Sequence, residues 1–447
     1  MKTSPGQRYI ERAVSLPTDP LTALTALVEA GLHEQHIVYE QPRQWSYAGG
    51  VLAEISLDRS GAHLRGVTDG ISLDWNDKPL LQIRQLLDSF PVPGWRAYGW
   101  AAFELAYAKD GDRSAVGEQP LLHLIIPRTE VRIDGGTAVV RATDTESLDA
   151  VTECLAAATN PPAPVAAPID VRHGATHYQR AVADAVDAIH ADRFQKVILS
   201  RTFAVNKEID LLATYRHGRK ANNPARSFLL NLGGIEATGF SPEVVVAVDA
   251  DGRVISQPLA GTRALTGDPA RDGHLRTELL SNPKEIYEHA ISVKIAVDEL
   301  VGVCTPDSLS VEEFMTVRER GTVQHLASRV GGRLADGHDA WDAFAAVFPA
   351  VTASGVPKAA AYEAIRSLEP AARGLYSGAV FSVDHNGSMD AALVLRAVYR
   401  QFGRTWLQAG AGIVGQSRPE REFEETCEKL DSVAKFLVPA AAPVAAG

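Results

Sequence analysis

Short apolar runs, bounded by glycine, asparagine and aspartate, recur along the chain and predict buried strands. Such runs occupy 196–205 (KVILSRTFAV), 227–233 (SFLLNLG) and 243–256 (EVVVAVDADGRVIS), the last folding back at Asp251–Gly252. Two more hairpins are predicted, at 131–142 around Gly135–Gly136 and at 378–399 around Asn386–Gly387. The apolar segment 99–108 fits a buried strand or a buried helix equally well.

Apolar positions recur with helical periodicity in four other segments. They are 177–192, a long stretch from about 271 to 301, 357–368, and a last helix that carries REFEETCEKL at 421–430. Runs of strands and tight hairpins, punctuated by helices, are typical of an α+β fold with a large antiparallel sheet.

Composition changes clearly at one internal place, PPAPVAAP at 161–168, which predicts an exposed connection. Residues 1–160 contain few candidate chemical groups, and we expect them to complete the fold. Residues 170–437 contain nearly all of the candidates. The Pro- and Ala-rich end, residues 438–447, is predicted to be a disordered tail.

The overall composition excludes several classes of protein. The chain has 447 residues, 45% of them hydrophobic, and a net charge of -11, which offers no basic surface for nucleic acid. No apolar run approaches the ~20 residues of a membrane helix, and the N-terminus lacks the apolar core of a signal peptide. Three widely spaced cysteines form neither a metal cluster nor a disulfide framework. These features predict a soluble cytoplasmic protein.

GAGIVG at 410–415 has the spacing of a dinucleotide-binding fingerprint. Such a site needs a helix directly after the glycines and an acidic residue ~20 positions further on. Here the helix begins only after Pro419, and the chain ends before another strand–helix unit could fit. Two interpretations remain open: glycines required by close strand packing, or backbone amides offered to an anion.

Glutamates are concentrated in two helical segments. REFEETCEKL carries Glu422, Glu424, Glu425 and Glu428, and KEIYEH carries Glu285 and Glu288. Carboxylates three residues apart share a helix face, so two facing helices could bring four of them together around a cation. Oxygen ligands favour Mg²⁺, and His289 has the wrong spacing for a di-iron site. The alternative is two solvated acidic faces.

Four further residues interrupt apolar surroundings. Lys196 opens an apolar strand, where burial would lower its pKa toward that of a base, unless it reaches solvent. Glu243 leads another such strand, where burial would let it act as an acid, unless it is a turn carboxylate. Arg396 should pair with an acid or with a bound carboxylate. His325 by itself is consistent with a core histidine.

Several longer motifs occur in an order that resembles the chorismate-utilising enzymes. They are SPE (241–243), PLAGTRA (258–264), SNPKEIYEHA (281–290), RERGTVQHL (318–326), FPAVTASGVPK (348–358), GLYSGAV (374–380), QAGAGIV (408–414) and REFEETCEKL (421–430). The similarity is dense from about residue 175 to 437. Within the family, the sequences of these motifs most closely resemble those of the salicylate synthases of siderophore pathways, such as that of mycobactin.

The resemblance implies a monomeric Mg²⁺ enzyme that acts on chorismate, with a large two-lobed antiparallel sheet, helices outside it and the active site between the lobes. It implies that Lys196 is the base that activates water for attack at ring carbon 2. Glu243 would be the acid that protonates the hydroxyl leaving carbon 4. The metal ligands implied are Glu285, Glu288, Glu422 and Glu425.

The resemblance also implies the residues that hold the substrate. Tyr376 and Arg396 would bind the enolpyruvyl carboxylate, and His325 and Thr352 would line the cavity where pyruvate is eliminated. The remaining carboxylate contacts implied are the amides of Gly261, Thr262, Gly410 and Gly412 and the ammonium group of Lys429.

Two features bear on the exact reaction. Relatives that use ammonia typically have glutamine where this chain has Lys196, and no glutaminase-type segment is visible. The resemblance therefore implies a salicylate synthase, which makes isochorismate and then salicylate and pyruvate. Alternatives are an isochorismate synthase that stops at the first product, favoured by Val394 where many relatives have threonine, and a catalytically inactive chorismate-binding protein. A metal hydrolase lacks a visible second ligand set.

Overall fold

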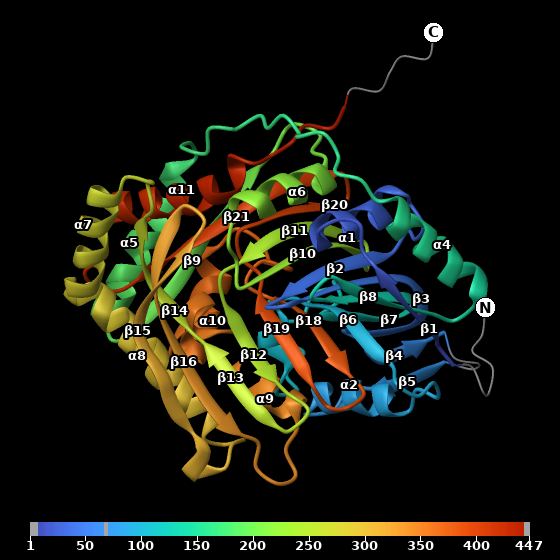
Figure 1. The fold of residues 1–447 in the computed structure, drawn as a ribbon. Coiled ribbons are helices and arrows are strands. Elements are labelled where there is room, and N and C mark those ends of the chain that lie inside the picture. Colours follow the sequence, from blue (N-terminus) through green and yellow to red (C-terminus); the bar gives the residue numbers. More distant parts are fainter. Residues whose placement is uncertain (1–7, 67–69, 442–447) are drawn as a thin grey trace.

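A computed structural model describes residues 8–66 and 70–441, and Figure 1 shows how their helices and strands are arranged. The described strands form one 21-stranded sheet, and all pairings between them are antiparallel. Helices cover the outside of the sheet (Figure 1). The predicted α+β class with a large antiparallel sheet is therefore confirmed.

The first part of the chain, to residue 157, contributes eight strands and four helices. In chain order they are β1 (Ile10–Ser15), α1 (Pro20–Glu29), β2 (His36–Gln41), β3 (Gln44–Asp58), β4 (Gly61–Arg65), β5 (Ile71–Asp74), α2 (Pro79–Asp88), β6 (Arg96–Ala101), α3 (Leu105–Ala108), β7 (Leu122–Asp134), β8 (Thr137–Ala142) and α4 (Thr145–Ala157). The predicted hairpin at Gly135–Gly136 joins β7 to β8, and the apolar segment 99–108 divides between β6 and α3.

The second part begins after an irregular connection that includes 161–168. It contains α5 (Ala175–His190), β9 (Lys196–Ala204), α6 (Leu211–Ala221), β10 (Arg226–Leu232), β11 (Ile235–Ser241), β12 (Val244–Val248), β13 (Arg253–Gln257), β14 (Leu259–Ala264), α7 (Pro269–Ser281) and α8 (Pro283–Leu300). After these come a 3₁₀ turn η1 (Pro306–Ser308), β15 (Ser310–Arg320), β16 (Val323–Arg333), α9 (Ala340–Val347), a turn η2 (Val351–Ala353), β17 (Gly355–Val356), α10 (Lys358–Leu368), β18 (Ala379–Asp384), β19 (Met389–Leu393), β20 (Ala397–Gln401), β21 (Arg404–Ile413) and α11 (Pro419–Ala434).

The two parts share one sheet. β2 pairs with β3 on one side and with β10 on the other, and β6 pairs with both β7 and β18. Backbone hydrogen bonds between neighbouring strands therefore cross the boundary near residue 160 in two places. The first 160 residues therefore contribute strands to the same sheet as the second part.

Side chains on the two faces of the central strands enter different cores. On β2, Ile37 and Tyr39 join an inner core, whereas Val38 joins an outer one. On β6, Tyr98 and Trp100 face the same inner core, which contains strand and loop residues but no helical ones among the described residues. The outer cores contain the helices. The sheet therefore folds back on itself and buries one face against another part of the same sheet.

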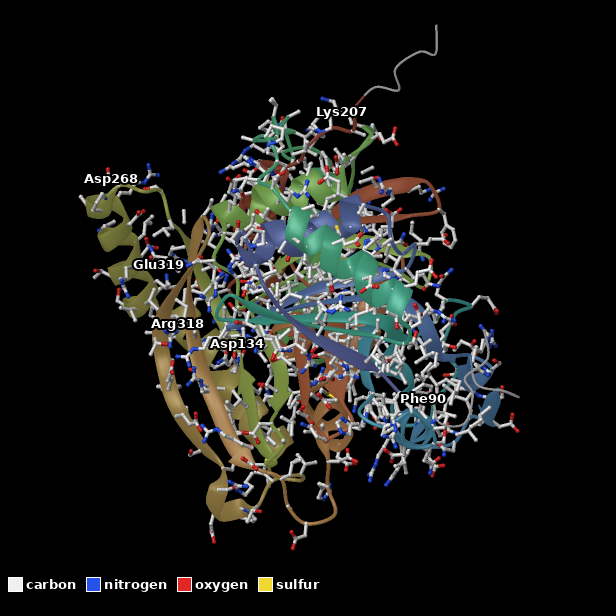
Figure 2. All side chains as sticks on the ribbon, turned by 45° about the vertical axis from the view of Figure 1, so that its right-hand side comes forward. Phe90, Asp134, Lys207, Asp268, Arg318 and Glu319 are labelled. Atoms are coloured by element: carbon white, nitrogen blue, oxygen red, sulfur yellow. The ribbon has the colours of Figure 1, made fainter. Side chains whose placement is uncertain are left out.

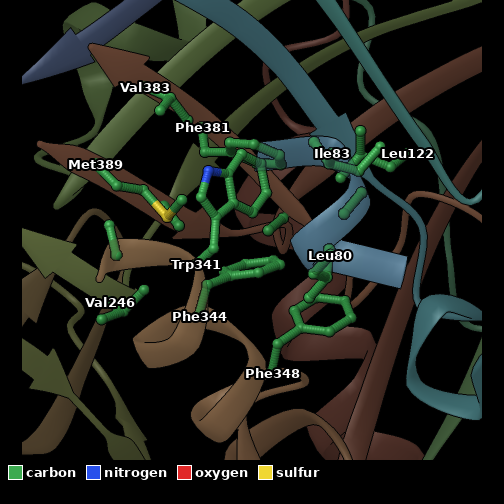
Figure 3. Packing of buried hydrophobic residues seen from close by; sticks show 14 of the residues in the cluster. Leu80, Ile83, Leu122, Val246, Trp341, Phe344, Phe348, Phe381, Val383 and Met389 are labelled. Atoms are coloured by element: carbon green, nitrogen blue, oxygen red, sulfur yellow. The ribbon is translucent and has the colours of Figure 1, made fainter. Parts of the chain in front are cut away.

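Aromatic packing holds α9 against the sheet, as Figure 3 shows. The Trp341 ring centroid lies 6.0 Å from that of Phe381 on β18, and Phe344 stacks on Phe348 at 4.8 Å. Leu80 and Ile83 of α2 close the cluster (Figure 3). Because Phe348 is fixed in this core, the segment that follows it, including Thr352, has a defined position.

The prediction of one long helix from about 271 to 301 is wrong, because the structure has two helices in this range. α7 ends at Ser281, and α8 starts at Pro283. Asn282 between them has an extended backbone, and its side chain accepts hydrogen bonds from the Lys284 and Glu285 amides. An asparagine cap followed by proline is a helix start that overrides the continuous apolar periodicity. Asp268, labelled in Figure 2, caps α7 in the same way.

The predicted tail is also corrected at its start. The Ala440 amide donates to the Glu208 carbonyl, the Asp210 amide donates to the Val438 carbonyl, and Val438 is buried. Residues 438–440 are therefore part of the fold, and 442–447 lie outside the described residues. Within 8–66 and 70–441, no helix combines the length and the hydropathy needed to cross a membrane.

Candidate active site

A cavity lies between two parts of the sheet, β9–β21 and β14–β16, and is closed by α8 and α11. Segments far apart in the sequence therefore meet at one place. Twelve of the residues predicted from the sequence line it: Glu243, Gly261, Thr262, Glu288, His325, Thr352, Tyr376, Arg396, Gly410, Gly412, Glu425 and Lys429. The other three predicted residues, Lys196, Glu285 and Glu422, are not part of the lining.

Lys196 is the first residue of β9, and its side chain is buried. Its Nζ lies 3.0 Å from Glu288 Oε1 and 3.4 Å from Ser292 Oγ, both on α8. The alternative of a solvent-exposed strand-end lysine is therefore wrong. A buried lysine needs a polar partner, and Glu288, which does line the cavity, provides it.

Glu243 lies in the short connection between β11 and β12 and is 3% exposed. Burial raises its pKa to about 8, although hydrogen bonding to Thr352 and the charge of Lys196 oppose the rise. Thr352 Oγ1 donates to Glu243 Oε1 at 2.5 Å. The carboxyl group is therefore mostly protonated at neutral pH and can donate a proton into the cavity.

We expect Glu243→Gln to change the pH dependence of stability. The folded protein keeps this proton up to pH about 8, whereas the unfolded chain releases it near the ordinary value of 4.5. Because the folded state then binds more protons, this group makes the free energy of unfolding fall as pH rises between those values. Urea unfolding at several pH values should show a smaller fall in Glu243→Gln than in the wild type. Parallel curves for the two proteins would contradict the prediction.

Arg396 has an unusual backbone and no acidic partner in the part of the chain that the structure describes. Its φ of 52° is left-handed, which is costly for a non-glycine residue and typical of functional positions. Its guanidinium contacts His325 Nε2 and the Arg320 carbonyl. Burial, and then the charge of Arg320, lower its pKa to about 9. The sequence predicted that Arg396 pairs either with an acidic side chain or with a bound carboxylate. No described acidic side chain pairs with it, so the structure favours a bound carboxylate.

His325 lines the cavity and is more than a core histidine. Its Nδ1 lies 2.9 Å from Thr262 Oγ1, and its Nε2 contacts Arg396. Burial, followed by the charges of Arg396 and Lys429, holds its pKa well below the usual value. The imidazole is therefore neutral near pH 7 and accepts or donates hydrogen bonds without adding charge.

The glycines of 410–415 allow other groups to approach β21 closely. A Cβ atom on Gly412 would lie 2.2 Å from Glu288 Oε1, and one on Gly410 would lie 2.9 Å from Tyr376 Oη. Close packing is therefore one reason for these glycines. The dinucleotide fingerprint was correctly excluded, because β21 ends at Ile413 and α11 begins only at Pro419.

The amides of the same glycines face the cavity side. Lys429 Nζ donates to the Gly410 carbonyl at 2.8 Å. In an antiparallel strand, the N–H and C=O groups of one residue point to the same side, and the pattern repeats every two residues. The amides of Gly410 and Gly412 therefore point to the side on which Lys429 contacts the Gly410 carbonyl. Both interpretations of the motif, close packing and amides available to an anion, are consistent with this geometry.

Each of the four predicted metal ligands is paired with a basic side chain. The pairs are Glu285 with Arg263 (2.8 Å), Glu288 with Lys196 (3.0 Å), Glu422 with Lys284 (2.9 Å) and Glu425 with Lys429 (2.8 Å). Among the described residues, no three His, Cys, Asp or Glu side chains form a group with metal-binding geometry. The four carboxylates were expected to converge on one metal ion. They do not converge in this structure, because each contacts its own lysine or arginine side chain.

The four carboxylates nevertheless suit a hard cation. Burial raises the pKa of Glu422, and the nearby charge of Glu425 raises it further. Burial also raises the pKa of Glu285. The charges of Glu288 and Glu425 raise this pKa further, whereas the hydrogen bond to Arg263 lowers it. Glu422 Oε2 is buried without a hydrogen-bond partner. Mutual repulsion, oxygen donors and an unpartnered buried oxygen are features that Mg²⁺ would satisfy.

The other two glutamates of REFEETCEKL, Glu424 and Glu428, lie on a solvated acidic face, which was the alternative to a metal site. Glu424 pairs with Arg172 and Glu428 with Arg421, and all four side chains are at least partly exposed. α11 therefore has one face toward the cavity and one toward solvent.

Sequence reasoning missed Gln408, which lines the cavity and donates to Ser200 Oγ at 2.9 Å. The signal was available, because this glutamine interrupts the apolar strand TWLQAGAGIV as Arg396 interrupts LVLRAVY. Val394 is buried in the inner core and is not part of the lining, whereas Leu395 and Arg396 are.

The chain is similar to known enzymes along most of its length. The family model of the chorismate binding enzymes matches residues 34–435. A salicylate synthase of Mycolicibacterium paratuberculosis is 43% identical over 426 residues, which cover 94% of each chain. An anthranilate synthase component 1 of Methanothermobacter thermautotrophicus is 39% identical over 260 residues, 58% of this chain and 56% of that protein.

Solved structures show the same architecture. Anthranilate synthase component I from Streptococcus pneumoniae superposes with a TM-score of 0.74 at 27% identity, covering 88% of this chain and 92% of that one. The menaquinone-specific isochorismate synthase of Escherichia coli shares the fold, with a TM-score of 0.75 at 20% identity over 97% of this chain and 95% of that one. With a family match over most of its length and a relative that is 43% identical over 94% of it, the chain belongs to the chorismate binding enzymes.

Proposed function

We propose that the protein is a salicylate synthase, which converts chorismate to isochorismate and then to salicylate and pyruvate. The observation that supports this most directly is a possible base and a possible acid at one cavity. Lys196 contacts the lining residue Glu288, and Glu243 lines the cavity with a pKa of about 8. Similarity to a salicylate synthase along 94% of the chain supports the same reaction.

In the first step, water attacks ring carbon 2 as the hydroxyl group leaves carbon 4. Lys196, acting as the neutral amine, accepts a proton from the attacking water, and Glu243 donates one to the departing hydroxyl, which leaves as water. Protons and atoms balance, so the step is an isomerisation. Thr352 donates to Glu243 Oε1 and so orients the carboxyl group in the cavity.

The substrate is held through its carboxylates. Arg396, which has no acidic partner among the described residues, and Tyr376 would bind the enolpyruvyl carboxylate. The amides of Gly261, Thr262, Gly410 and Gly412 and the ammonium group of Lys429 would contact carboxylate oxygens. Mg²⁺, held by Glu285, Glu288, Glu422 and Glu425, would neutralise the carboxylate on the ring.

The second step needs positioning more than added chemistry. A hydrogen shift within isochorismate releases pyruvate and makes the ring aromatic, so no external base is required. Neutral His325 and Thr352 line the cavity and would hold the enolpyruvyl arm over the ring. Two alternatives are an enzyme that stops at isochorismate and an inactive chorismate-binding protein. The second is disfavoured because Lys196, Glu243 and all four glutamates are present.

Product analysis tests the proposal. Purified protein with chorismate and Mg²⁺ should give salicylate and pyruvate in equal amounts, with isochorismate appearing transiently on chromatography. A final mixture of chorismate and isochorismate without salicylate would identify an isochorismate synthase instead. Unchanged chorismate would support the inactive binding protein. Size-exclusion chromatography of the same sample tests the predicted monomer.

A further inference from the structure

Lys284 is a basic residue whose place in the site was not expected from the sequence. It lies in the first turn of α8, directly before Glu285, and its Nζ is 2.9 Å from Glu422 Oε1 on α11. Glu422 is 1% exposed, and within the described chain Lys284 is its ion-pair partner. An uncompensated buried carboxylate is costly, so Lys284 provides the counter-charge that Glu422 requires.

Lys284 is held more loosely than the cations of the other three glutamates. Its Nζ has no second partner among the described residues. Each of the other cations has a second hydrogen bond or ion pair: Arg263 with Thr262 O and Glu278, Lys429 with Gly410 O, and Lys196 with Ser292. Lys284 is therefore the cation that can leave its glutamate for solvent with the smallest loss of contacts.

A metal ion and Lys284 would interfere at Glu422. Mg²⁺ binds carboxylate oxygens at about 2.1 Å, so a shared Glu422 Oε1 would place the metal no more than about 5 Å from Nζ. A divalent and a unit positive charge at that separation repel strongly, even with an effective dielectric constant of ~20. The two cations are thus alternatives at this carboxylate.

We propose that Lys284 is a built-in competitor of Mg²⁺, which holds Glu422 when the metal is absent and moves into solvent when it binds. This inference rests on the Mg²⁺ dependence in the proposed function. It adds that Lys284 lowers the affinity of the site for Mg²⁺. Without such a counter-ion, the carboxylates would repel one another and destabilise the folded protein. The same lysine then weakens metal binding, because its contact must be broken first.

Isothermal titration of the metal-free protein with Mg²⁺ measures the effect. Lys284→Gln should bind Mg²⁺ with a Kd about tenfold lower than that of the wild type, because the competing charge is gone. Lys294→Gln is the matched control, since Lys294 lies on the same helix but pairs with the exposed Asp298. Its Kd should equal that of the wild type. A Kd for Lys284→Gln within twofold of the wild type would overturn the proposal.

Thermal unfolding provides a second readout that does not depend on activity. In EDTA, Lys284→Gln should unfold at a lower temperature than the wild type, and saturating Mg²⁺ should close the gap. A gap that persists with Mg²⁺, or a variant that does not fold even with Mg²⁺, would show that the lysine is needed for another reason. If the wild type itself binds no Mg²⁺, the metal part of the proposed function fails as well, and the two failures are distinguishable.

Discussion

Lys196→Ala should lose the conversion of chorismate to isochorismate, with a rate reduced by about 100- to 10,000-fold. Water is a poor nucleophile, and no other basic side chain takes the place of Lys196 beside Glu288 among the described residues. The same variant should still convert supplied isochorismate to salicylate, because the elimination needs no external base. Ultraviolet absorbance and chromatography distinguish the two reactions in one preparation.

This split between the two steps also controls for folding. A variant that processes isochorismate at close to the wild-type rate has an intact cavity, so its failure with chorismate is a loss of the base. Lys294→Ala, on the exposed side of α8, should leave both steps unchanged. A near-normal rate of isochorismate formation by Lys196→Ala at neutral pH would show that Lys196 is structural. Loss of both steps together would point to the same conclusion.

Glu425→Gln should reduce turnover of chorismate by at least ~100-fold and weaken Mg²⁺ binding. The amide keeps the size of the side chain but removes the negative charge that a metal requires. Although burial alone would raise it, the charges of Lys429 and Lys284 hold the pKa of Glu425 below its ordinary value. The wild-type residue is therefore ionised and available as a ligand at neutral pH. Titration calorimetry measures Mg²⁺ binding, and chromatography measures turnover.

Glu424→Gln is the matched control on the same helix. Glu424 is partly exposed and pairs with Arg172, so its replacement should change activity and Mg²⁺ affinity little, and stability by less than ~1 kcal/mol. Full activity of Glu425→Gln, or full activity of the wild type in excess chelator, would contradict the prediction. Equal loss of activity in both variants would mean that the charge of α11 as a whole matters.

Local pattern was enough to predict many of the elements. The hairpins at Gly135–Gly136, Asp251–Gly252 and Asn386–Gly387 form as predicted, because the turn residues themselves have the backbone freedom that tight turns need. The helix break at Asn282 was missed, although its signal was local. The apolar periodicity continues through this Asn-Pro pair, so periodicity alone predicts one helix.

The candidate site was predicted from ordered motifs, and the fold brings twelve of the fifteen predicted residues to the lining of one cavity. Sequence spacing could place Glu285 and Glu288, or Glu422 and Glu425, on one helix face, because that depends on three-residue spacing within a helix. The same reasoning could not tell a solvated face from a cavity face. Glu424 and Glu425 are neighbours in sequence, yet one faces solvent and the other lines the cavity.

Only the tertiary structure decided which polar side chains meet. Lys284 and Glu422 are 138 residues apart, and Arg396 and His325 are 71 apart, so no local pattern contains these contacts. The raised pKa of Glu243 likewise depends on burial by distant segments, including Thr352. The sequence by itself determined the α+β class, the hairpins and the residue types available for chemistry, since these follow from short-range periodicity and turn geometry. The folded sheet decided their partners, exposure and protonation, because those properties depend on groups that lie about 70 to 140 residues apart in the sequence.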